Sequence, residues 1–300
     1  MKLAGIVVLA GAAFVGLAGA AGGWTTHAPL PVPRTEVAAS ALGNEIVVVG
    51  GFLENGGSSR RVDIYAPASD SWRSGPDLPS AVNHAAAAVA RGRLYVLGGY
   101  GAERSAFVLS GNAWKTLSLP APRAAAGAAA VRGTVYVVGG VGENGNARSM
   151  LAYDTRSGRW RTLPGPRPRQ HLALAATRGR IYAIAGRTSG LNTNFTLVES
   201  WAPGEKRWRR EAPVPEARGG TGAAAIGSTI VSVGGEAPGG TVRTVYAYDV
   251  ARRRWRRLAD LPTPRHGLGV ATLDGAVYVI GGGPQPGLYV SDANESLDVG

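Results

Sequence analysis

The segment TVYVVGG, residues 134–140, decides the fold because five related segments accompany it along the chain. Each is a short apolar run, rich in β-branched and aromatic residues, that ends on a glycine doublet or its remnant. The doublets recur every 41 to 49 residues, and tryptophans recur in step with them. A period of this length indicates either helical solenoid repeats or the blades of a propeller. The doublets end at Gly51, Gly99, Gly140, Gly186, Gly235 and Gly282, and the tryptophans are Trp24, Trp72, Trp114, Trp160, Trp208 and Trp255.

The third repeat indicates four short strands and no helix. Small apolar residues at 126–131 precede the turn Arg132-Gly133, and the quoted segment follows as a second strand. After a polar loop, residues 150–154 and 159–163 read as a third and a fourth strand separated by a turn. Proline and glycine are spread through the unit, so a helix of about ten residues or more fits nowhere. Sheets packed radially around an axis bury both of their faces, which predicts an all-β propeller.

The doublet, a following aromatic residue and a tryptophan resemble the kelch repeat. In five units the aromatic residue stands seven positions before the tryptophan, and the resemblance covers residues 24–300. The fourth unit departs from the pattern, because Ala185-Gly186 stands where a doublet is expected. The resemblance implies a six-bladed kelch β-propeller with four antiparallel strands in each blade. The pairs are Tyr65/Trp72, Phe107/Trp114, Tyr153/Trp160, Trp201/Trp208 and Tyr248/Trp255.

The two ends of the repeat region complement each other. Trp24 precedes every doublet, so it reads as a fourth strand without its own first three. The last unit has a doublet and a third strand near residues 296–299, and then no tryptophan. We therefore expect the N-terminal strand to complete the last blade and close the ring. Residues 21–300 are predicted to form one domain, and we expect a monomer.

Residues 1–20 have the pattern of a secretory signal peptide. Lys2 is followed by an uncharged apolar run from residue 3 to residue 18, and Ala18-Gly19-Ala20 resembles a cleavage site. The sequence thus predicts export to a periplasmic, extracellular or envelope-associated location, with an uncleaved anchor as the alternative. The chain has no cysteine, so its core is expected to need no disulfide.

Arginine dominates the net charge of +12. Residues 252–257 and 206–210 surround two of the repeat tryptophans with arginine and lysine, on the expected outer strands. Such a rim can hold an anionic envelope surface. The alternative is a solvated edge whose charges keep exposed strands from pairing with other chains. Nucleic acid is not expected as a partner, since no run of stacking aromatics accompanies the charge.

Loops that join the second to the third strand, and each blade to the next, share one face of a propeller. Five of the six blades begin after the pattern Pro-x-x-Arg, and the second blade has Val82 in place of the arginine. The resemblance implies that this arginine ties neighbouring blades together. The next two residues, and the residue after each doublet, are expected around the mouth of the channel. The arginines are Arg34, Arg123, Arg169, Arg218 and Arg265. The predicted ligand-binding residues of the mouth are Phe52, His84, Tyr100, Gln170, His171, Arg187, Glu236 and His266.

Three of these residues are histidines, at the start of every second blade. Such spacing is typical of a metal site. However, His266 is one position out of register with His84 and His171, and a six-bladed mouth is expected to be too wide for three ligands on one ion. The sequence therefore predicts no metal site and no cofactor.

Two enzyme activities are known from kelch-related proteins, and only one of them is compatible with the residues of this chain. The loop from Gly235 to Arg243 is similar to a stretch of exported sialic-acid mutarotases, which implies Glu236 as the acid or base that opens the sugar ring and Arg243 as a clamp for its carboxylate. The insertions expected in that group are missing. Galactose oxidase-like chemistry is excluded, because it needs a tyrosine cross-linked to a cysteine and the chain has none.

The sequence favours a binding module over an enzyme. It contains no P-loop, dinucleotide fingerprint, HExxH motif or nucleophile elbow. The leading hypothesis is an exported kelch propeller that binds a glycan or protein partner through its mouth. A sugar mutarotase or epimerase using Glu236 and Arg243, and a structural module of the cell envelope, are the alternatives.

Overall fold

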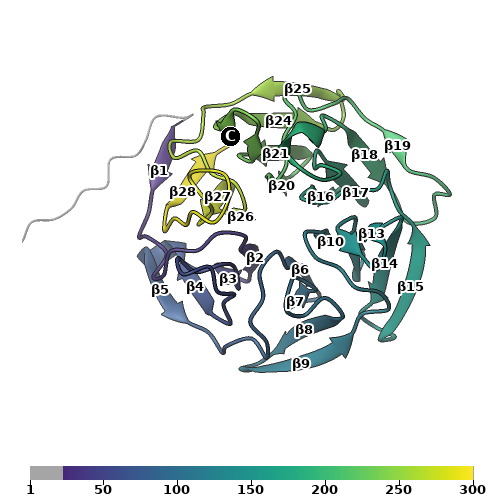
Figure 1. The fold of residues 1–300 in the computed structure, drawn as a ribbon, viewed down its shortest axis with the longest axis horizontal. Coiled ribbons are helices and arrows are strands. Elements are labelled where there is room, and N and C mark those ends of the chain that lie inside the picture. The colour runs from purple at the N-terminus through teal and green to yellow at the C-terminus, as the bar shows by residue number, and fades with distance from the viewer. Residues whose placement is uncertain (1–22, 300) are drawn as a thin grey trace, which may run out of the picture.

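The computed structural model describes residues 23–299, and the predicted signal peptide, residues 1–20, lies outside this part of the chain. Within residues 23–299, six four-stranded antiparallel sheets surround a central channel (Figure 1). This arrangement confirms the all-β, six-bladed propeller that the repeat predicts. Successive strands of each blade run from the channel to the outer edge.

The blades take their strands in chain order, apart from the last. The first three blades are β2 (Ala38–Leu42), β3 (Glu45–Val49), β4 (Val62–Ala66) and β5 (Ser71–Ser74); β6 (Ala86–Ala90), β7 (Arg93–Leu97), β8 (Ser105–Ser110) and β9 (Ala113–Ser118); and β10 (Gly127–Val131), β11 (Thr134–Val138), β14 (Ser149–Asp154) and β15 (Arg159–Pro164). The next two are β16 (Ala173–Thr177), β17 (Arg180–Ile184), β18 (Val198–Trp201) and β19 (Arg209–Arg210); and β20 (Gly222–Ile226), β21 (Thr229–Val233), β24 (Val245–Asp249) and β25 (Arg254–Arg257). The sixth is β26 (Gly269–Leu273), β27 (Ala276–Ile280), β28 (Asn294–Asp298) and β1 (Trp24–Thr26).

Short elements decorate the connecting loops. Two-residue ribbons form in the loops of the third and fifth blades, and two 3-10 turns lie in the first and fourth. They are β12 (Val141–Gly142) with β13 (Gly145–Asn146), β22 (Glu236–Ala237) with β23 (Gly240–Thr241), η1 (Pro67–Ser69) and η2 (Leu191–Thr193).

The ring closes as the sequence predicts. β1 pairs antiparallel with β28, with Trp24 opposite Leu297, so both ends of the chain contribute to the sixth blade. Figure 1 shows β1 at the outer edge beside β28. Leu30, just after β1, is 2% exposed and packs with residues of the first and sixth blades. The N-terminal strand therefore completes the sixth blade and connects it to the first blade.

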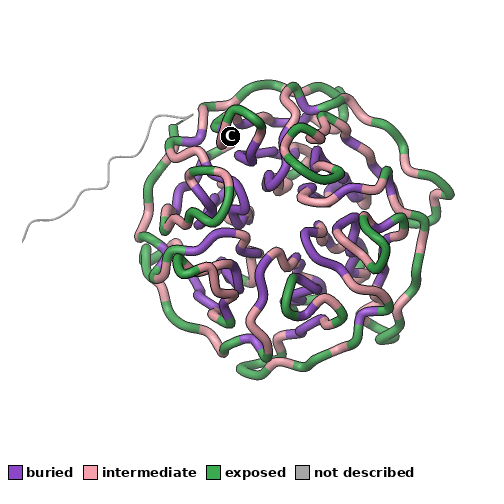
Figure 2. The backbone as a smooth tube through the Cα atoms, viewed as in Figure 1, coloured by how far each residue is buried: buried purple, intermediate pink, exposed green. Residues whose placement is uncertain are grey.

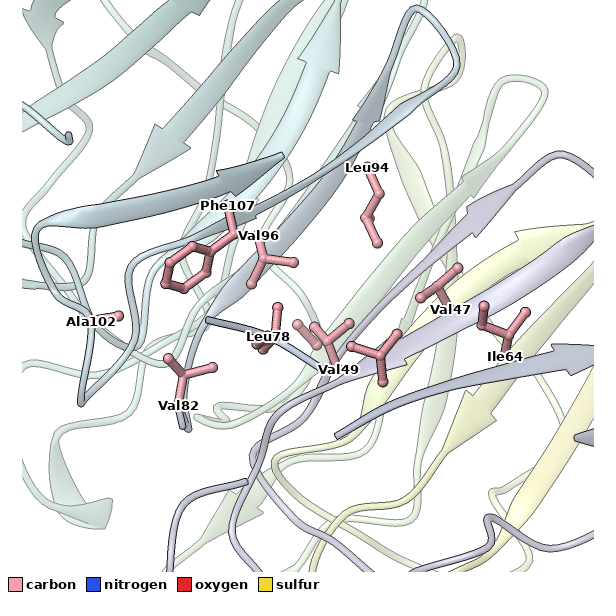
Figure 3. Packing of buried hydrophobic residues seen from close by; sticks show 11 residues of the cluster. Val47, Val49, Ile64, Leu78, Val82, Leu94, Val96, Ala102 and Phe107 are labelled. Atoms are coloured by element: carbon pink, nitrogen blue, oxygen red, sulfur yellow. The ribbon is translucent and has the colours of Figure 1, made fainter. Parts of the chain in front are cut away.

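Six apolar clusters lie between neighbouring blades. Figure 3 shows the cluster between the first two, where Val47 and Ile64 face Leu94 and Phe107. Equivalent clusters fill the other five junctions. Burial is greatest on the second and third strands of each blade, while the outer strands and many loops are exposed (Figure 2). Each blade is thus stabilised by its neighbours, as expected for sheets that cannot bury both faces alone.

Five of the repeat tryptophans donate a hydrogen bond from the outer part of their blade to the preceding blade. Trp72 Nε1 donates to Ala28 O at 2.9 Å, and Trp255 Nε1 donates to Ala212 O at 2.9 Å. Tyr65 lies directly opposite Trp72 on the neighbouring strand, in agreement with the seven-residue spacing. The second blade differs, because a shorter turn places Leu109, not Phe107, opposite its tryptophan.

A set of six framework positions, one at the start of each blade, explains the Pro-x-x-Arg repeat. At every one, the main-chain carbonyl accepts from the last doublet glycine of the preceding blade at 2.8–2.9 Å. The arginine side chains are almost completely buried and bond mainly within their own blade. The inter-blade tie that the resemblance attributes to arginine is therefore made by its main chain, which Val82 supplies equally well. The framework positions are Arg34, Val82, Arg123, Arg169, Arg218 and Arg265.

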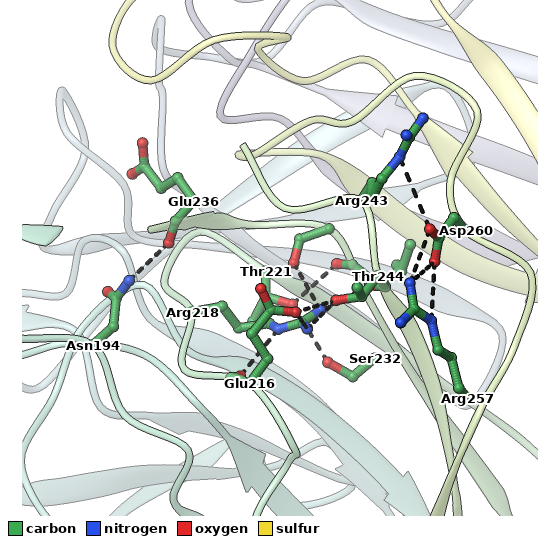
Figure 4. A network of polar contacts seen from close by, with 12 residues as sticks. Asn194, Glu216, Arg218, Thr221, Ser232, Glu236, Arg243, Thr244, Arg257 and Asp260 are labelled. Carbon is green, nitrogen blue, oxygen red and sulfur yellow. Dashed lines mark hydrogen bonds and ion pairs between the residues drawn. The ribbon is translucent and has the colours of Figure 1, made fainter. Parts of the chain in front are cut away.

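The arginine side chains fix the connecting segment to the blade that follows. Arg218 donates to Thr244 O at 2.8 Å and to Glu216 Oε2 at 2.9 Å (Figure 4). Arg265 donates to Glu295 Oε2 at 2.7 Å and to Val279 O at 3.0 Å. Charge-assisted bonds of this kind satisfy a buried guanidinium at several nitrogens at once.

Candidate functional site

Two residues beyond each framework position, the chain reaches the channel. We call these six the channel positions. All have positive φ, between 51° and 61°, which lets the chain turn sharply into the inner strand. Main-chain hydrogen bonds of 2.9–3.2 Å run from one blade to the next around the complete circle. The channel positions are Glu36, His84, Ala125, His171, Gly220 and Gly267.

This main-chain circle brings six residues of different chemistry to the channel. Three are polar and three are small, so the ring is regular in its backbone and uneven in its chemistry. Below it, the channel is lined mainly by alanines of the six inner strands. Above it opens a cavity of about 340 Å³ on the mouth face.

The cavity collects most of the predicted mouth residues. Its walls include six of the eight, together with the channel residue Glu36 and the loop residues Leu191 and Leu288. The remaining two lie outside the cavity wall: Tyr100 contacts the His84 ring, and Gln170 contacts the His171 ring. The six that line it are Phe52, His84, His171, Arg187, Glu236 and His266.

Glu36 is the hub of the site, which sequence reasoning missed as a functional residue. Its Oε2 lies 3.2 Å from His84 Nε2, and its Oε1 lies 3.2 Å from His266 Nδ1. Burial would raise the pKa of Glu36, but the interaction with His84 and the hydrogen bond from His266 hold that pKa well below its ordinary value. The signal was present in the sequence, since Glu36 shares its register with His84 and His171.

The amide side chains before two of the histidines orient the rings. Asn83 Oδ1 is 2.6 Å from His84 Nδ1, while its amide nitrogen donates to Ser58 Oγ at 2.7 Å. Gln170 Oε1 is 3.1 Å from His171 Nδ1. Burial lowers the pKa of His171 to about 3 against the opposing charge of Glu36, so this ring is neutral at neutral pH.

His266 is a different kind of histidine. Its Nε2 lies 3.0 Å from Gln285 O and its Nδ1 faces Glu36, so both nitrogens act as donors to acceptor oxygens. Burial opposes protonation, but the bond to Glu36 and the charges of Glu36 and Glu236 outweigh it and raise the pKa of His266. His266 therefore orients the carboxylate of Glu36.

Glu236 lies beside His266, whose Nδ1 is 3.9 Å from Glu236 Oε2, and forms a buried ion pair. Its Oε1 is 2.5 Å from Arg187 Nη1, and its main-chain oxygen accepts from Asn194 Nδ2 at 2.7 Å. Glu236 is 4% exposed and Arg187 pairs with it from the fourth blade. The cavity thus carries one carboxylate–guanidinium pair across two blades.

Arg243 does not join Glu236, contrary to the arrangement that the mutarotase resemblance implies. The ribbon β22–β23 pairs Glu236 with Thr241 and returns the chain outward before Arg243. Arg243 is largely exposed, and its Nε lies 4.0 Å from Asp260 Oδ2 (Figure 4). The arginine near Glu236 is Arg187.

Apolar side chains surround the polar cavity. The Phe52 and Tyr100 rings meet the His84 ring edge-on at 5.7 and 5.4 Å between centroids. Burial and nearby carboxylates raise the pKa of Tyr100, which is therefore a neutral phenol at neutral pH. Leu288 and Tyr289, in the loop of the sixth blade, are more than half exposed. Sequence reasoning placed this loop near the mouth without selecting these two residues.

The ligand atoms of Glu36, His84 and His171 lie within 4.8 Å of one another. The expectation that the mouth is too wide for three ligands is therefore wrong for these residues. His84 and His171 come from the second and fourth blades, and the small residue Ala125 lies between them. It leaves room for the two rings to approach to 5.0 Å between their centroids. His266 stays outside the group, as its register predicted.

The arginine-rich rim is partly neutralised by acidic neighbours. Arg252 lies 2.7 Å from Asp249, Arg253 lies 3.0 Å from Glu211, and Arg257 lies 2.8 Å from Asp260. These arginines are exposed and lie on the outer edge of the fifth blade. No helix within residues 23–299 is long and apolar enough to cross a membrane.

Comparison with known proteins agrees with the architecture. A family model described as the KLHDC2/KLHL20/DRC7 Kelch-repeats domain matches residues 36–213, and a Kelch motif model matches residues 217–262. Kelch-like protein 35 of Mus musculus is 34% identical over 76 residues, which are 25% of this chain and 12% of that protein. F-box/kelch-repeat protein SKIP30 of Arabidopsis thaliana is 39% identical over 75 residues, 25% of this chain and 21% of that protein. The matches thus cover about an eighth to a fifth of those relatives' lengths. With a family model over more than half of its residues and six kelch-type blades in the structure, this chain belongs to the kelch-repeat β-propeller family.

Proposed function

We propose that this propeller is a non-catalytic binding module that holds a short segment of a partner protein at its mouth. The observation that carries the proposal is the mixed chemistry of the mouth cavity. Its walls combine buried polar groups with the apolar side chains of Leu191 and Leu288. The exposed Tyr100 contacts the cavity residue His84, and the exposed Tyr289 follows Leu288 in the chain. Concave sites with a few fixed polar groups and aromatic anchors are typical of ligand recognition.

The uneven channel positions support the same function. A purely structural ring would gain nothing from one carboxylate and two histidines at three positions and from small residues at the other three. Membership of the kelch family adds support, since its propellers are typically protein-interaction modules. A glycan is the second candidate ligand, because sugar rings also favour aromatic faces beside polar groups.

Binding to displayed peptides tests the proposal. A library of random linear heptapeptides is panned against the immobilised chain, and enriched peptides are titrated against Tyr100→Ala and Leu288→Ser. Both side chains are exposed, so we expect the fold to survive and binding to weaken about 10-fold or more, equivalent to about 1.4 kcal/mol. The matched control is Arg252→Glu on the outer rim, which should bind as the parent does.

The other hypotheses give distinct results in the same experiment. Binding that falls with Arg252→Glu and with salt, but not with Tyr100→Ala, would favour the envelope-associated structural module. Enrichment on a glycan array with no enriched peptide would favour a carbohydrate ligand. Anomer exchange of N-acetylneuraminate that is lost in Glu236→Gln would favour a mutarotase, with Arg187 in the place assigned to Arg243.

We also propose that the protein acts outside the cytoplasm. The proposal rests on the charged, apolar and small-residue pattern of residues 1–20. Expression of the full chain in a bacterial host, followed by fractionation and intact-mass measurement, tests it. We expect a product that lacks residues 1–20 in the exported fraction; a full-length product in the cytoplasm would contradict the proposal.

A further inference from the structure

Glu36, His84 and His171 form a cluster of three metal-type donors at the base of the mouth cavity. They come from the first, second and fourth blades and occupy equivalent channel positions. Since the main-chain circle fixes their backbones, the three side chains are held by the architecture rather than by a mobile loop. Such preorganisation is a requirement for a metal site built from separate elements.

The spacing of the donors fits one small cation. A tetrahedral ion with bonds of about 2.1 Å separates its ligand atoms by about 3.4 Å. Glu36 Oε2 and His84 Nε2 are already 3.2 Å apart, and no pair in the cluster exceeds 4.8 Å. A movement of the His171 ring by about 1.4 Å or less would complete the set, without any change of backbone.

A second layer of hydrogen bonds orients the donors. Asn83 and Gln170 hold the Nδ1 atoms of the two histidines, which leaves Nε2 of each ring for the cluster. His266 holds Oε1 of Glu36, which leaves Oε2. Metal-binding histidines usually donate their other nitrogen to an oxygen acceptor in this way, and metal-binding carboxylates are hydrogen-bonded in turn.

The orientation of Asn83 also fixes which ring nitrogen of His84 faces the cluster. Its amide nitrogen is directed to Ser58 Oγ, so its oxygen faces His84 Nδ1, which must donate. The Nε2 atom of His84 then faces Glu36 Oε2 at 3.2 Å, which places two metal-type donor atoms side by side.

From this geometry we propose that Glu36, His84 and His171 bind one divalent transition-metal ion of the Zn²⁺ type. Two imidazoles and one carboxylate suit such ions, and a site with three protein ligands keeps a position open. The cavity of about 340 Å³ lies directly above the cluster and gives space for water or a ligand oxygen at that position. The site would serve any partner that offers a carboxylate or carbonyl oxygen, and its existence does not depend on the partner's identity.

Metal titration of the mature chain tests the proposal. Protein freed of metal by a chelator is titrated with Zn²⁺ by calorimetry and with Co²⁺ by visible absorption, which reports the ligand geometry. We expect one ion per chain, a Co²⁺ spectrum of four- or five-coordinate type, and displacement of Co²⁺ by Zn²⁺. The substitutions His84→Asn and His171→Asn are each expected to weaken Zn²⁺ binding about 100-fold or more. Asparagine is chosen because it tolerates positive φ, which is 52° at His84 and 53° at His171.

Two further variants separate ligation from folding. His27→Gln removes a histidine far from the cluster and should leave binding unchanged. Gln170→Leu removes only the partner of His171 Nδ1 and should weaken binding about 10- to 100-fold, as loss of an orienting bond does. Thermal unfolding in chelator identifies any variant that has lost its fold.

The outcomes are decisive in either direction. Absence of saturable Zn²⁺ and Co²⁺ binding by the parent chain in the micromolar range would overturn the proposal. Binding that survives both histidine variants would also overturn it. Loss in both, with retention in His27→Gln, would establish the site whether or not any peptide binds.

Discussion

The framework and channel positions lie two residues apart in the same connecting segment, yet their side chains differ in burial and in chemistry. The framework positions carry arginine five times out of six, and these arginines are almost completely buried. The channel positions share their backbone conformation but carry glutamate, histidine, alanine or glycine. Repetition marks residues that every blade junction needs, and variation marks residues that only one site needs. In a repeat protein, the exceptions to the repeat therefore identify the functional surface.

Deletion of residues 23–30 is expected to have the largest effect on stability, because it removes the strand that closes the ring. It removes β1, exposes the edge of β28 and leaves the clusters of the first and sixth blades without Leu30. Burial of one leucine is worth about 1.5–3 kcal/mol, and the lost strand pairing adds to it, so we expect the free energy of unfolding to fall by about 5 kcal/mol or more. Denaturant unfolding of chains that begin at residue 21 and at residue 31 measures the difference. Equal midpoints would show that the ring does not depend on its closing strand.

Arg265→Leu is expected to have the next largest effect. It leaves the carboxylate of Glu295, 3% exposed, without its cationic partner, which costs about 3–5 kcal/mol. The double variant Arg265→Leu/Glu295→Leu should lose less, since no buried charge remains unpaired. Arg252→Leu on the exposed rim is the control and should change stability by less than about 0.5 kcal/mol. If Arg252→Leu costs as much as Arg265→Leu, the division between framework and surface arginines is wrong.

The channel positions differ in the space that they leave for a side chain, and substitution of two glycines tests this difference. Both Gly220 and Gly267 have positive φ, so alanine costs about 1 kcal/mol at either. A Cβ on Gly267 would also lie 2.5 Å from Glu36 Oε1 and 2.8 Å from Glu36 N, while the nearest atom to one on Gly220 is 3.4 Å away. We expect about 1 kcal/mol for Gly220→Ala and about 2 kcal/mol or more for Gly267→Ala by calorimetry. Equal losses would show that the circle relaxes around Gly267.

The smallest expected effect concerns His27, the histidine that belongs to neither set. The ring centroid of His27 lies 5.4 Å from that of Tyr278, and its Nε2 lies 2.7 Å from Ser296 Oγ. Burial lowers the pKa of His27 below its ordinary value, against the opposing charge of Asp70.

Because the folded pKa of His27 is depressed, its contribution to stability is complete above the unfolded value near pH 6.5 and is lost as the pH falls toward the folded value. The groups that face it are Asp70, Tyr65, Tyr278 and Ser296. In chelator, His27→Gln should lose less stability than the parent between pH 7 and pH 5, measured by denaturant unfolding. Parallel pH profiles would contradict this assignment.

The extent of sequence-based prediction follows the same division. The doublets and tryptophans fix blade number, strand order and ring closure, because their spacing is local and repeats. Register then places His84, His171 and Glu236 at the mouth, as predicted. Arg243 came from the mutarotase resemblance and not from register, and the ribbon β22–β23 returns the chain outward before that residue. Register alone did not reveal the importance of Glu36, whose partners are up to 230 residues away in the chain.

The sequence alone determined a six-bladed, all-β kelch propeller closed by its N-terminal strand, because backbone geometry and apolar spacing within each repeat are sufficient to specify a blade. Only the tertiary structure decided which side chains meet across the channel. The distances among Glu36, His84, His171 and His266, and the pairing of Glu236 with Arg187, arise when six separate segments converge on one axis. No local pattern encodes such distances, since they depend on the radius of the closed ring and on the small residues at Ala125, Gly220 and Gly267 that leave room within it.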